Sequence, residues 1–352
     1  MISRFEIVDA ESLRPDADRI IFCDGTGGDL FYERDDLELS HWRPNRTPPE
    51  YRAGTSTEIC FRFLDHPRPG PWLVAVNNHV DMDGILSVYV LVESRHALNN
   101  RRTLIQAAEM GDFWGWGDLP AQRIFQGVAR LMKRAKGRDV YEEAFRRIPS
   151  LIDGTDQEIP EIDASLEQLR LGLQLIEQEK IIRNPLGDRL THYIIPFSVA
   201  GDDECQVDFV PKFNAAVSPE GLLWPQARAF RDPQRICLLS TERPGGWFHD
   251  LWFPGYLWAD TEGLWQVPGM HYDDGMGSYQ LDHPGLIEAF ESLQRQETGK
   301  GRWNLGGTHL QGEFDLQSRF PLVGRYADDA GRAALSMLSP NLVAGELSGR
   351  LA

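Results

Sequence analysis

Short runs of apolar residues in the first eighty positions predict two buried strands. They occupy residues 19–24 (RIIFCD) and 73–76 (LVAV), and turn-forming or polar residues follow each run. An uninterrupted apolar run of this length is typical of a strand covered on both faces, as in a parallel sheet packed between other layers. The run at 19–24 ends in Asp24 and the turn GTGG, whose glycines fit either a phosphate cradle or an ordinary loop.

Apolar residues at helical spacing predict helices between and after these strands. Thr55 and Glu58 form a capping box for a helix that we expect to reach about Leu64. Further helices are predicted over residues 101–110 (ending before Gly111), 121–136 and 162–182. These helices are expected to cover one face of the sheet.

Beyond Pro185 the pattern changes to short strands separated by Pro, Gly and Asp turns, in THYIIPFSV, QVDFV, RICLLST and GGWFHDLWFPGYLWAD. The fold class predicted is therefore α/β, with a mainly parallel sheet flanked by helices and a second, strand-rich portion in the C-terminal half. We place the domains at residues 1–184 and 185–352, with a soft boundary near Asn184. Because the first half shows two clear strands, strands from the second half are expected to complete its sheet.

Metal-ligand side chains follow the strand at 73–76, in the stretch PWLVAVNNHVDMDGILSVYVLV. His79, Asp81 and Asp83 stand at alternate positions, so they are expected to project to one side and to converge on a cation. Gly84 allows the backbone to turn into a helix that begins near Ile85. Ordinary turn residues are the alternative, although a turn does not require a His two residues upstream.

An imidazole with carboxylates suits manganese, iron or zinc, and magnesium if carboxylates and water dominate the coordination. Two carboxylates one residue apart can also bridge a pair of metal ions, as in many phosphoryl-transfer enzymes. The His-Asp-Asp pattern therefore predicts a metal site with one ion or two.

This element resembles the first motif of the DHH phosphoesterase superfamily, in which His79, Asp81, Asp83, Gly84 and Ser87 fill the motif positions. The resemblance implies a manganese-dependent hydrolase of phosphodiester or phosphoanhydride bonds, with the first three residues as metal ligands. It also implies a second-motif aspartate, for which Asp112 is the candidate, and a glycine-rich phosphate-binding segment similar to Gly306–His309 (GGTH). The namesake Asp-His-His tripeptide is absent, and the nearest strings, at 65–67 and 282–284, have Pro in third place.

Two other resemblances bear on this interpretation. The segments LSHWRPNRTPPEYRAGTSTEI, NHVDMDGILSV and GDF together are similar to an uncharacterised bacterial family. The string DMDGILS is similar to the haloacid dehalogenase phosphatase signature, but residues 77–80 separate the strand from Asp81, and Ile85 stands where that signature has Thr. The metal-cluster interpretation is therefore preferred.

The loop at residues 41–49 carries side chains suited to an anionic ligand. His41, Arg43, Asn45 and Arg46 lie in a polar, proline-rich stretch, and guanidinium groups bind phosphate through paired donors. We predict that these residues and His309 bind substrate. The alternative is a surface loop anchored by Trp42.

The net charge and the cysteine content limit the classes of partner and cofactor that we expect. A formal charge of −17 over 352 residues repels long polyanions, which favours a small phosphorylated molecule or nucleotide over long nucleic acid. Four scattered cysteines argue against a zinc ribbon or a disulfide framework, and no apolar run is long enough to cross a membrane. We expect a cytoplasmic protein, and a homo-oligomer is compatible with the sequence. The basic interval at 130–147 is interpreted as solvated helix faces.

The leading functional hypothesis is a metal-dependent hydrolase of a phosphate ester or anhydride, with manganese as the favoured metal and His79, Asp81, Asp83 and Asp112 as catalytic metal ligands. The remaining ligands are expected from the second half, among His249, Asp250, Asp260, His271, Asp273 and Asp274. Two alternatives stay open. One is a catalytically inactive nucleotide- or metal-binding protein that retains this element, and the other is a metallohydrolase with a non-phosphate substrate.

Overall fold

The computed structural model describes the chain except for residues 1, 3, 10, 78, 202–214, 218–221, 256–258, 262–269, 274–277, 282–283, 309–313, 316–321 and 352. The chain divides into two compact units. Unit 1 comprises Met1–Leu166 with Ala259–Leu264, and unit 2 comprises Glu167–Trp258 with Trp265–Ala352. The division falls within helix α7 (Ile159–Glu177). The domain boundary that we place near Asn184 stays a prediction.

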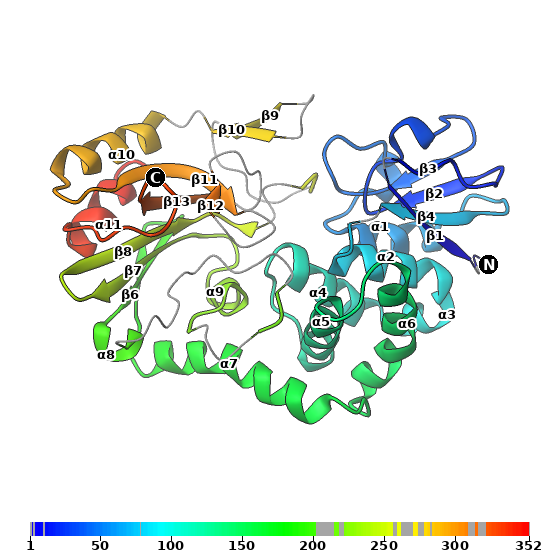
Figure 1. Cartoon of the computed structure of the whole chain (residues 1–352), viewed down its shortest axis with the longest axis horizontal. Coiled ribbons are helices and arrows are strands. Elements are labelled where there is room, and N and C mark those ends of the chain that lie inside the picture. Colours follow the sequence, from blue (N-terminus) through cyan, green and yellow to red (C-terminus); the bar gives the residue numbers. More distant parts are fainter. Residues whose placement is uncertain are drawn as a thin grey trace. The chain divides into compact units, whose positions relative to one another are not determined.

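Unit 1 contains a parallel sheet with strand order β1-β4-β2-β3 (Figure 1). Its strands are β1 (Phe5–Val8), β2 (Ile20–Cys23), β3 (Leu37–Leu39) and β4 (Leu73–Asn77). β4 pairs in parallel with both β1 and β2, and β2 pairs in parallel with β3. The carboxyl ends of all four strands therefore lie at the same edge of the sheet.

The expectation that strands from the second half complete this sheet is wrong. Among the described residues all four of its strands come from the first 77 positions. β1 and β3 are short and each contains a glutamate, Glu6 or Glu38, so neither forms the uninterrupted apolar run that identified β2.

Figure 1 shows the helices of unit 1 gathered on one side of this sheet. They are α1 (Ser56–Asp65), α2 (Met82–Val92), α3 (Ser94–Asn99), α4 (Arg101–Asp112), α5 (Leu119–Met132), α6 (Arg138–Asp153) and the first part of α7. α1 begins as predicted, because the Thr55 side chain caps it by accepting a hydrogen bond from the Glu58 N–H (3.1 Å). The predicted break at Gly111 is wrong, since α4 continues to Asp112.

A separate apolar cluster covers the other face of the sheet. Val8, Ile20, Phe22 and Ala75 are buried together, and Leu30 and Phe31, from the segment after β2, pack against them. Because both faces are covered, strand β2 is almost inaccessible to solvent. The burial fixes the positions of the residues that follow β2, β3 and β4.

Unit 2 is strand-rich. Its seven-stranded sheet, as far as the structure describes it, has the order β12-β11-β13-β8-β7-β6-β5 and is antiparallel except between β6 and β7. The strands of this unit are β5 (Ile182–Leu186), β6 (Leu190–Ile195), β7 (Ile236–Arg243), β8 (Gly246–Trp252), β11 (Arg302–Thr308), β12 (Phe314–Asp315) and β13 (Leu322–Ala327), with β9 (Met270–Asp273) and β10 (Ser278–Leu281) in a separate hairpin. The helices are α8 (Phe197–Ala200), α9 (Pro225–Arg231), α10 (Pro284–Gln296) and α11 (Pro340–Ser348). The chain is thus α/β with a strand-rich C-terminal half, as predicted.

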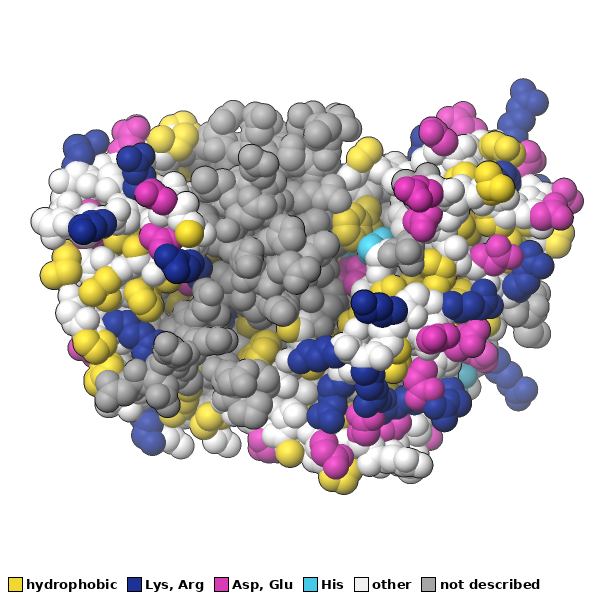
Figure 2. Space-filling model, in the orientation of Figure 1, with side chains coloured by type: hydrophobic (Ala, Val, Ile, Leu, Met, Phe, Trp, Pro, Cys, Tyr) yellow, Lys and Arg dark blue, Asp and Glu magenta, His cyan; other side chains and the backbone are white. Residues whose placement is uncertain are grey.

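The basic interval of α5 and α6 carries acidic partners. Arg130 and Arg134 both pair with Glu158, and Arg147 forms two hydrogen bonds with Asp156. Figure 2 shows acidic side chains among the basic ones over these helices. Every helix in the described part of the chain is too short or too polar to cross a bilayer.

Candidate metal centre

Three polar residues leave the sheet of unit 1 at the carboxyl ends of neighbouring strands. Asp24 directly follows β2, His41 lies two residues after β3, and His79 lies two residues after β4. In open sheets of parallel strands, ligands bind at this edge. The sheet therefore brings together side chains that are far apart in the sequence.

These residues form two groups with enough donors to hold a metal ion. The inner group is Asp24, His41, Asp83 and Asp112, and the outer group is Asp24, His79 and Asp81. Within each group the ligand atoms lie within 4.8 Å of one another. Asp24 belongs to both groups, so its carboxylate can link two cations.

His41 presents one ring nitrogen to the inner group. Its Nδ1 lies 2.7 Å from the carbonyl oxygen of Gly54, which can only accept, so Nδ1 carries the proton. Its Nε2 lies 3.7 Å from Asp24 Oδ1, 3.5 Å from Asp83 Oδ2 and 3.3 Å from Asp112 Oδ2. A ring held in this way directs the Nε2 lone pair of its neutral form toward three carboxylates, which is how backbone carbonyls orient metal-binding histidines.

Those separations match the spacing of ligands around one ion. Donors about 2.1 Å from a metal in tetrahedral or octahedral coordination lie roughly 3.0–3.4 Å from one another. The three separations from His41 Nε2 are at or slightly above that range. Its donor set of one imidazole and three carboxylates suits manganese, iron or zinc.

The amino end of helix α1 fixes Asp83. The Asp83 carboxylate accepts hydrogen bonds from the backbone N–H groups of Ser56 (2.6 Å) and Thr57 (2.8 Å). These N–H groups belong to the first turn of the helix, which has no intrahelical partners for them and favours an anion. α1 thus holds a carboxylate that belongs to α2.

Asp24 is held from several sides. Its Oδ1 accepts hydrogen bonds from Trp42 Nε1 (3.0 Å) and Ser56 Oγ (2.9 Å), and its Oδ2 lies 3.2 Å from His79 Nε2. The backbone of Asp24 has a positive φ of 53°, a conformation that Asp tolerates better than most residues. Each carboxylate oxygen therefore faces a different group.

The outer group reaches the surface. The His79 side chain is 32% exposed, whereas the side chains of Asp24, His41 and Asp83 are completely buried. His79 Nε2 lies 3.6 Å from Asp81 Oδ2, and the other oxygen of Asp81 caps α2 by accepting from the Gly84 N–H (2.8 Å). Solvent access thus lies on the His79 side of the centre.

The acidic groups disturb one another's protonation. Burial, together with the charge of Asp24, raises the pKa of Asp83 to about 6 and raises the pKa of Asp81 well above its ordinary value. Burial and the charges of Asp83 and Asp24 raise the pKa of Asp112 as well.

Asp24 and His79 form the opposite case. Burial alone would raise the pKa of Asp24, but the His79 hydrogen bond and the charges of His79 and His41 lower it to about 2. Burial disfavours the charged form of His79, yet the charge of Asp81 and the bond to Asp24 raise its pKa to about 9. Four carboxylates therefore face two imidazoles, and a divalent cation would relieve their repulsion.

Gly84 provides the space between the ligands. A Cβ added at this position would lie 2.9 Å from Asp24 Oδ2 and 3.0 Å from Asp81 Oδ1. Because non-bonded atoms do not approach a Cβ as closely as 2.9 Å, the Asp24 carboxylate or the helix backbone would have to move. The glycine after Asp83 is therefore required by the ligands themselves, in addition to its place in the turn.

The structure brings together the four residues that we predicted as metal ligands, namely His79, Asp81, Asp83 and Asp112. They do not converge on one point, because Asp83 and Asp112 belong to the inner group and the other two to the outer group. His41, which we predicted to bind substrate, lies in the inner group instead.

The other predicted substrate-binding residues that the structure describes contact acidic side chains outside these groups. Arg43 pairs with Asp260 (3.3 Å), and Asn45 donates a hydrogen bond to the same carboxylate (3.2 Å). Arg46 lies 3.6 Å from the buried Glu38, the pKa of which burial raises to about 7. His309 lies outside the described residues.

The second half of the chain does not supply the missing ligands, as far as the structure describes it. His249 lies between Ser240 Oγ (2.9 Å) and the carbonyl of Leu338 (3.2 Å) within unit 2, and Asp250 forms a buried pair with Arg325. The side chains of His271 and Asp273, and all of Asp274, lie outside the described residues.

The sequence does not single out Asp24 as a ligand, and it predicts His41 as a substrate-binding residue. The signal for Asp24 was its position at the end of a buried strand before a glycine-rich turn. His41 follows the unrecognised strand β3 by two residues, the same offset as His79 after β4. Once the two strands are placed beside β4, both residues fall at its carboxyl edge.

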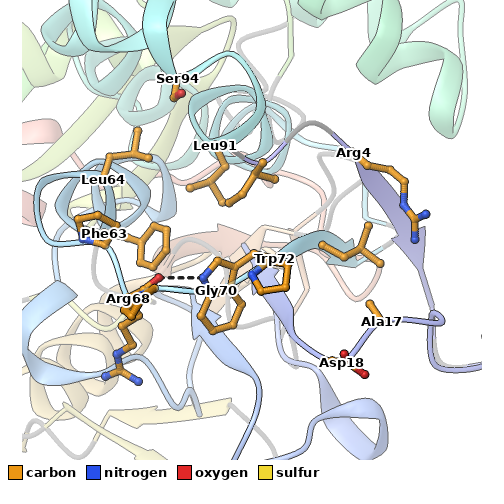
Figure 3. A pocket seen from close by; sticks show the side chains of 15 residues that line it. Arg4, Ala17, Asp18, Phe63, Leu64, Arg68, Gly70, Trp72, Leu91 and Ser94 are labelled. Carbon is orange, nitrogen blue, oxygen red and sulfur yellow. Dashed lines mark hydrogen bonds between the residues drawn. The ribbon is translucent and has the colours of Figure 1, made fainter.

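A large hollow lies at the other end of the sheet. It measures about 770 Å³, and its lining includes Arg4 and Asp18 before β1 and β2 and Trp72 beside β4. Figure 3 shows Trp72 and Phe63 in its wall, with Trp72 Nε1 donating to the carbonyl of Arg68 (3.0 Å). None of its lining residues belongs to either metal-ligand group, so we assign it no part in the candidate centre.

Comparisons with known proteins give one family match. A family model described as a family of unknown function (DUF6687) matches residues 10–179, which include every member of the inner and outer groups. No curated protein matches the sequence. Among solved structures, the chain is similar to the DHH domain of a member of a family of ribosomal proteins, with 12% identity and a TM-score of 0.32; the match covers 90% of this chain and 64% of that one.

Proposed function

We propose that unit 1 is a metal-dependent hydrolase that acts on a phosphate ester or anhydride of a small molecule or nucleotide. Two divalent cations, with manganese as the favoured metal, would be held by the inner and outer groups and linked by Asp24. Such a pair of ions lowers the pKa of water and neutralises charge on the transferring phosphoryl group when it is bound.

The observation that carries this proposal is the shared Asp24. Its carboxylate has one oxygen near His41 and the other near His79, 3.7 Å and 3.2 Å away. A single structural ion needs one closed set of ligands, whereas two adjoining sets that share a carboxylate are what a bridged pair of ions requires. The sequence element around Asp81 and Asp83, which resembles the DHH first motif, supports the same reaction class.

The inner and outer groups would have different roles. The inner group is closed to solvent, so it would hold its cation firmly and orient Asp24. The outer group opens at His79 and would leave coordination positions for water and for the substrate. Because Asp81 and His79 both come from one short loop, substrate would meet the centre on that side.

Arg43 and Asn45 are the residues that we propose for substrate binding. Both contact the Asp260 carboxylate, and this contact with an anion supports the proposal. A substrate phosphate has the same charge and acceptor geometry. Arg46, paired with Glu38, would contribute its positive charge.

The proposal is tested by metal content and by turnover. The purified protein is expected to retain about two manganese ions per chain and to hydrolyse bis(4-nitrophenyl) phosphate with manganese but not with a chelator. An Asp81→Asn, Asp83→Asn double variant is expected to lose metal and to fall in activity on the order of 100-fold.

A matched control is the Asp65→Asn, Asp163→Asn variant. It removes the same number of charges from two ion pairs outside the centre, the exposed pair of Asp65 with Arg101 and the half-buried pair of Asp163 with Arg123. It should keep the metal and the activity of the unmodified protein. Metal content that is equal in both double variants would contradict the proposal.

The burial of the inner group favours a second candidate, a metal- or nucleotide-binding protein without catalysis. Its four residues are at most 1% exposed, a degree of burial more usual for structural ions. Thermal unfolding with nucleotides, in the presence and absence of manganese, separates the two. Stabilisation without any turnover of the bound nucleotide would favour the binding role.

A further inference from the structure

Tyr141 lies against the candidate centre from an element that sequence reasoning did not connect with it. It belongs to α6, and its ring packs with those of Phe5 and Phe145, with centroids 5.6 Å and 6.3 Å away. The residue is completely buried. Its ring is therefore part of the core of unit 1, but its hydroxyl group has a different environment.

The Tyr141 hydroxyl has no hydrogen-bond partner among the described residues. Buried tyrosines normally place this group against an acceptor, because an unpartnered buried hydroxyl reduces stability. Tyr89 and Tyr193, which are buried to the same degree, follow the rule by bonding to His96 and Asp232. An exception beside a cluster of ligands requires an explanation.

Gly84 locates the hydroxyl. The position that a Cβ of Gly84 would occupy lies 3.5 Å from Tyr141 Oη, and the same position lies 2.9 Å from Asp24 Oδ2 and 3.0 Å from Asp81 Oδ1. The phenolic oxygen and the two carboxylate oxygens of the outer group therefore surround one point. The hydroxyl therefore lies beside the outer group, although it forms no hydrogen bond with either carboxylate.

We infer that Tyr141 donates a hydrogen bond to an oxygen of the anionic ligand bound at the outer group, and that the ligand class is a phosphate. The inference rests on the proposed function. A cation between Asp24 and Asp81 attracts phosphate oxygens, and a fixed neutral donor beside it adds direction without adding charge. The bound ligand is then the hydrogen-bond acceptor of the hydroxyl. Without the ligand the donor is buried without a partner, which lowers the stability of the protein.

The test compares two tyrosine variants. Tyr141→Phe removes the hydroxyl and keeps the ring, and Tyr89→Phe is the matched control, because its hydroxyl is bonded to His96 Nδ1 (2.7 Å). Manganese affinity and the affinity of the manganese-loaded protein for inorganic phosphate are measured by calorimetry. Tyr141→Phe is expected to weaken phosphate binding about ten-fold and to leave manganese binding within about three-fold of the unmodified protein. Tyr89→Phe should change neither.

Stability separates this role from a structural one. Metal-free Tyr141→Phe should unfold at the same temperature as the unmodified protein or a higher one, whereas Tyr89→Phe, which loses a bond, should unfold at a lower one. A lower unfolding temperature in Tyr141→Phe than in Tyr89→Phe would indicate a structural tyrosine and overturn the inference.

The remaining outcomes are distinct. Unchanged phosphate binding in Tyr141→Phe, or no phosphate binding by the manganese-loaded unmodified protein, would refute the inference and leave the metal centre standing. Failure of the unmodified protein to bind manganese at all would refute the proposed function, and this inference with it.

Discussion

Asp24 contributes one carboxylate oxygen to each side of the candidate centre. The oxygen near His41 is also held by Trp42 and Ser56, and the other lies against His79. A side chain fixed at both oxygens loses little freedom when it binds a cation, so its position is set before metal arrives. The buried carboxylates repel one another in the absence of a cation, and the cation that we propose would relieve this repulsion.

At the residue scale, Gly84→Ala tests the spacing of the ligands. The new methyl group would meet Asp24 Oδ2 and Asp81 Oδ1 at 2.9 Å and 3.0 Å, so one carboxylate must move. We expect manganese affinity, measured by calorimetry, to fall on the order of ten-fold or more.

Gly345→Ala is the control for this substitution. Gly345 lies within α11, and a Cβ at that position would meet nothing within 4 Å. Alanine is favoured over glycine in a helix by about 0.5–1 kcal/mol, so this variant should be more stable and bind manganese normally. Equal manganese affinities in the two variants would show that Gly84 is not required by the ligands.

How far single residues could be predicted follows from where their partners lie. His79, Asp81 and Asp83 occur within five positions, so the alternate spacing alone identified them. Asp24 and His41 acquire their meaning from the pairing of β2 with β3 and β4, which is a contact between distant segments. Tyr141 gave no signal, because an apolar helix face explains its position equally well.

At the scale of elements, α1 acts as a support for the centre. Its first two N–H groups hold the Asp83 carboxylate, and its cap residue Thr55 sets where the helix begins. The capping box made this start predictable from sequence, and the structure agrees. The sequence could not predict that the N–H groups of this first turn bind the Asp83 carboxylate of α2, since the contact depends on how the two helices pack.

Thr55→Ala is expected to affect both stability and metal binding. Loss of the cap should lower the free energy of unfolding by about 1 kcal/mol and loosen the turn that orients Asp83, so manganese should bind several-fold more weakly. Denaturant unfolding and calorimetry measure the two effects.

Ser339→Ala provides the comparison. Ser339 caps α11 by accepting from the Leu342 N–H, and it belongs to unit 2. It should cost a similar amount of stability and leave manganese affinity unchanged. If Thr55→Ala behaves in the same way, the helix does not orient the ligand.

At the scale of the whole molecule, the centre should make stability depend on pH. The pKa of Asp83 is about 6 in the folded protein, and those of Asp81 and Asp112 are also raised, whereas unfolded aspartates titrate near 3.9. Between these values the folded state binds more protons than the unfolded state, so stability falls as pH rises. His79, with a pKa of about 9, extends the fall above pH 6.5.

The sign gives a prediction for the metal-free protein. Its unfolding temperature should decrease from about pH 6.5 to pH 8, because stabilisation by protons on these groups is progressively lost. Below pH 6.5 the buried His192 and His249, the pKa of each of which burial lowers to about 4, act in the opposite direction. Manganese replaces those protons, so the increase in unfolding temperature that it causes should be larger at pH 8 than at pH 5. Scanning calorimetry with and without manganese measures this difference, and an increase that is independent of pH would contradict it.

Both groups lie in unit 1, and the family match also ends just beyond α7. The fold class could be predicted because long apolar runs and helical spacing are local signals. Which strands form the sheet could not be predicted, since β1 and β3 are short and each is interrupted by a glutamate.

Anomalous diffraction from crystals soaked in manganese tests whether two cations share the Asp24 carboxylate. We expect two peaks about 3.5–4 Å apart. One should be bounded by His41, Asp83 and Asp112 and the other by His79 and Asp81, each within bonding distance of one Asp24 oxygen. No peak at this edge of the sheet, or a single peak without contact to Asp24, would contradict it.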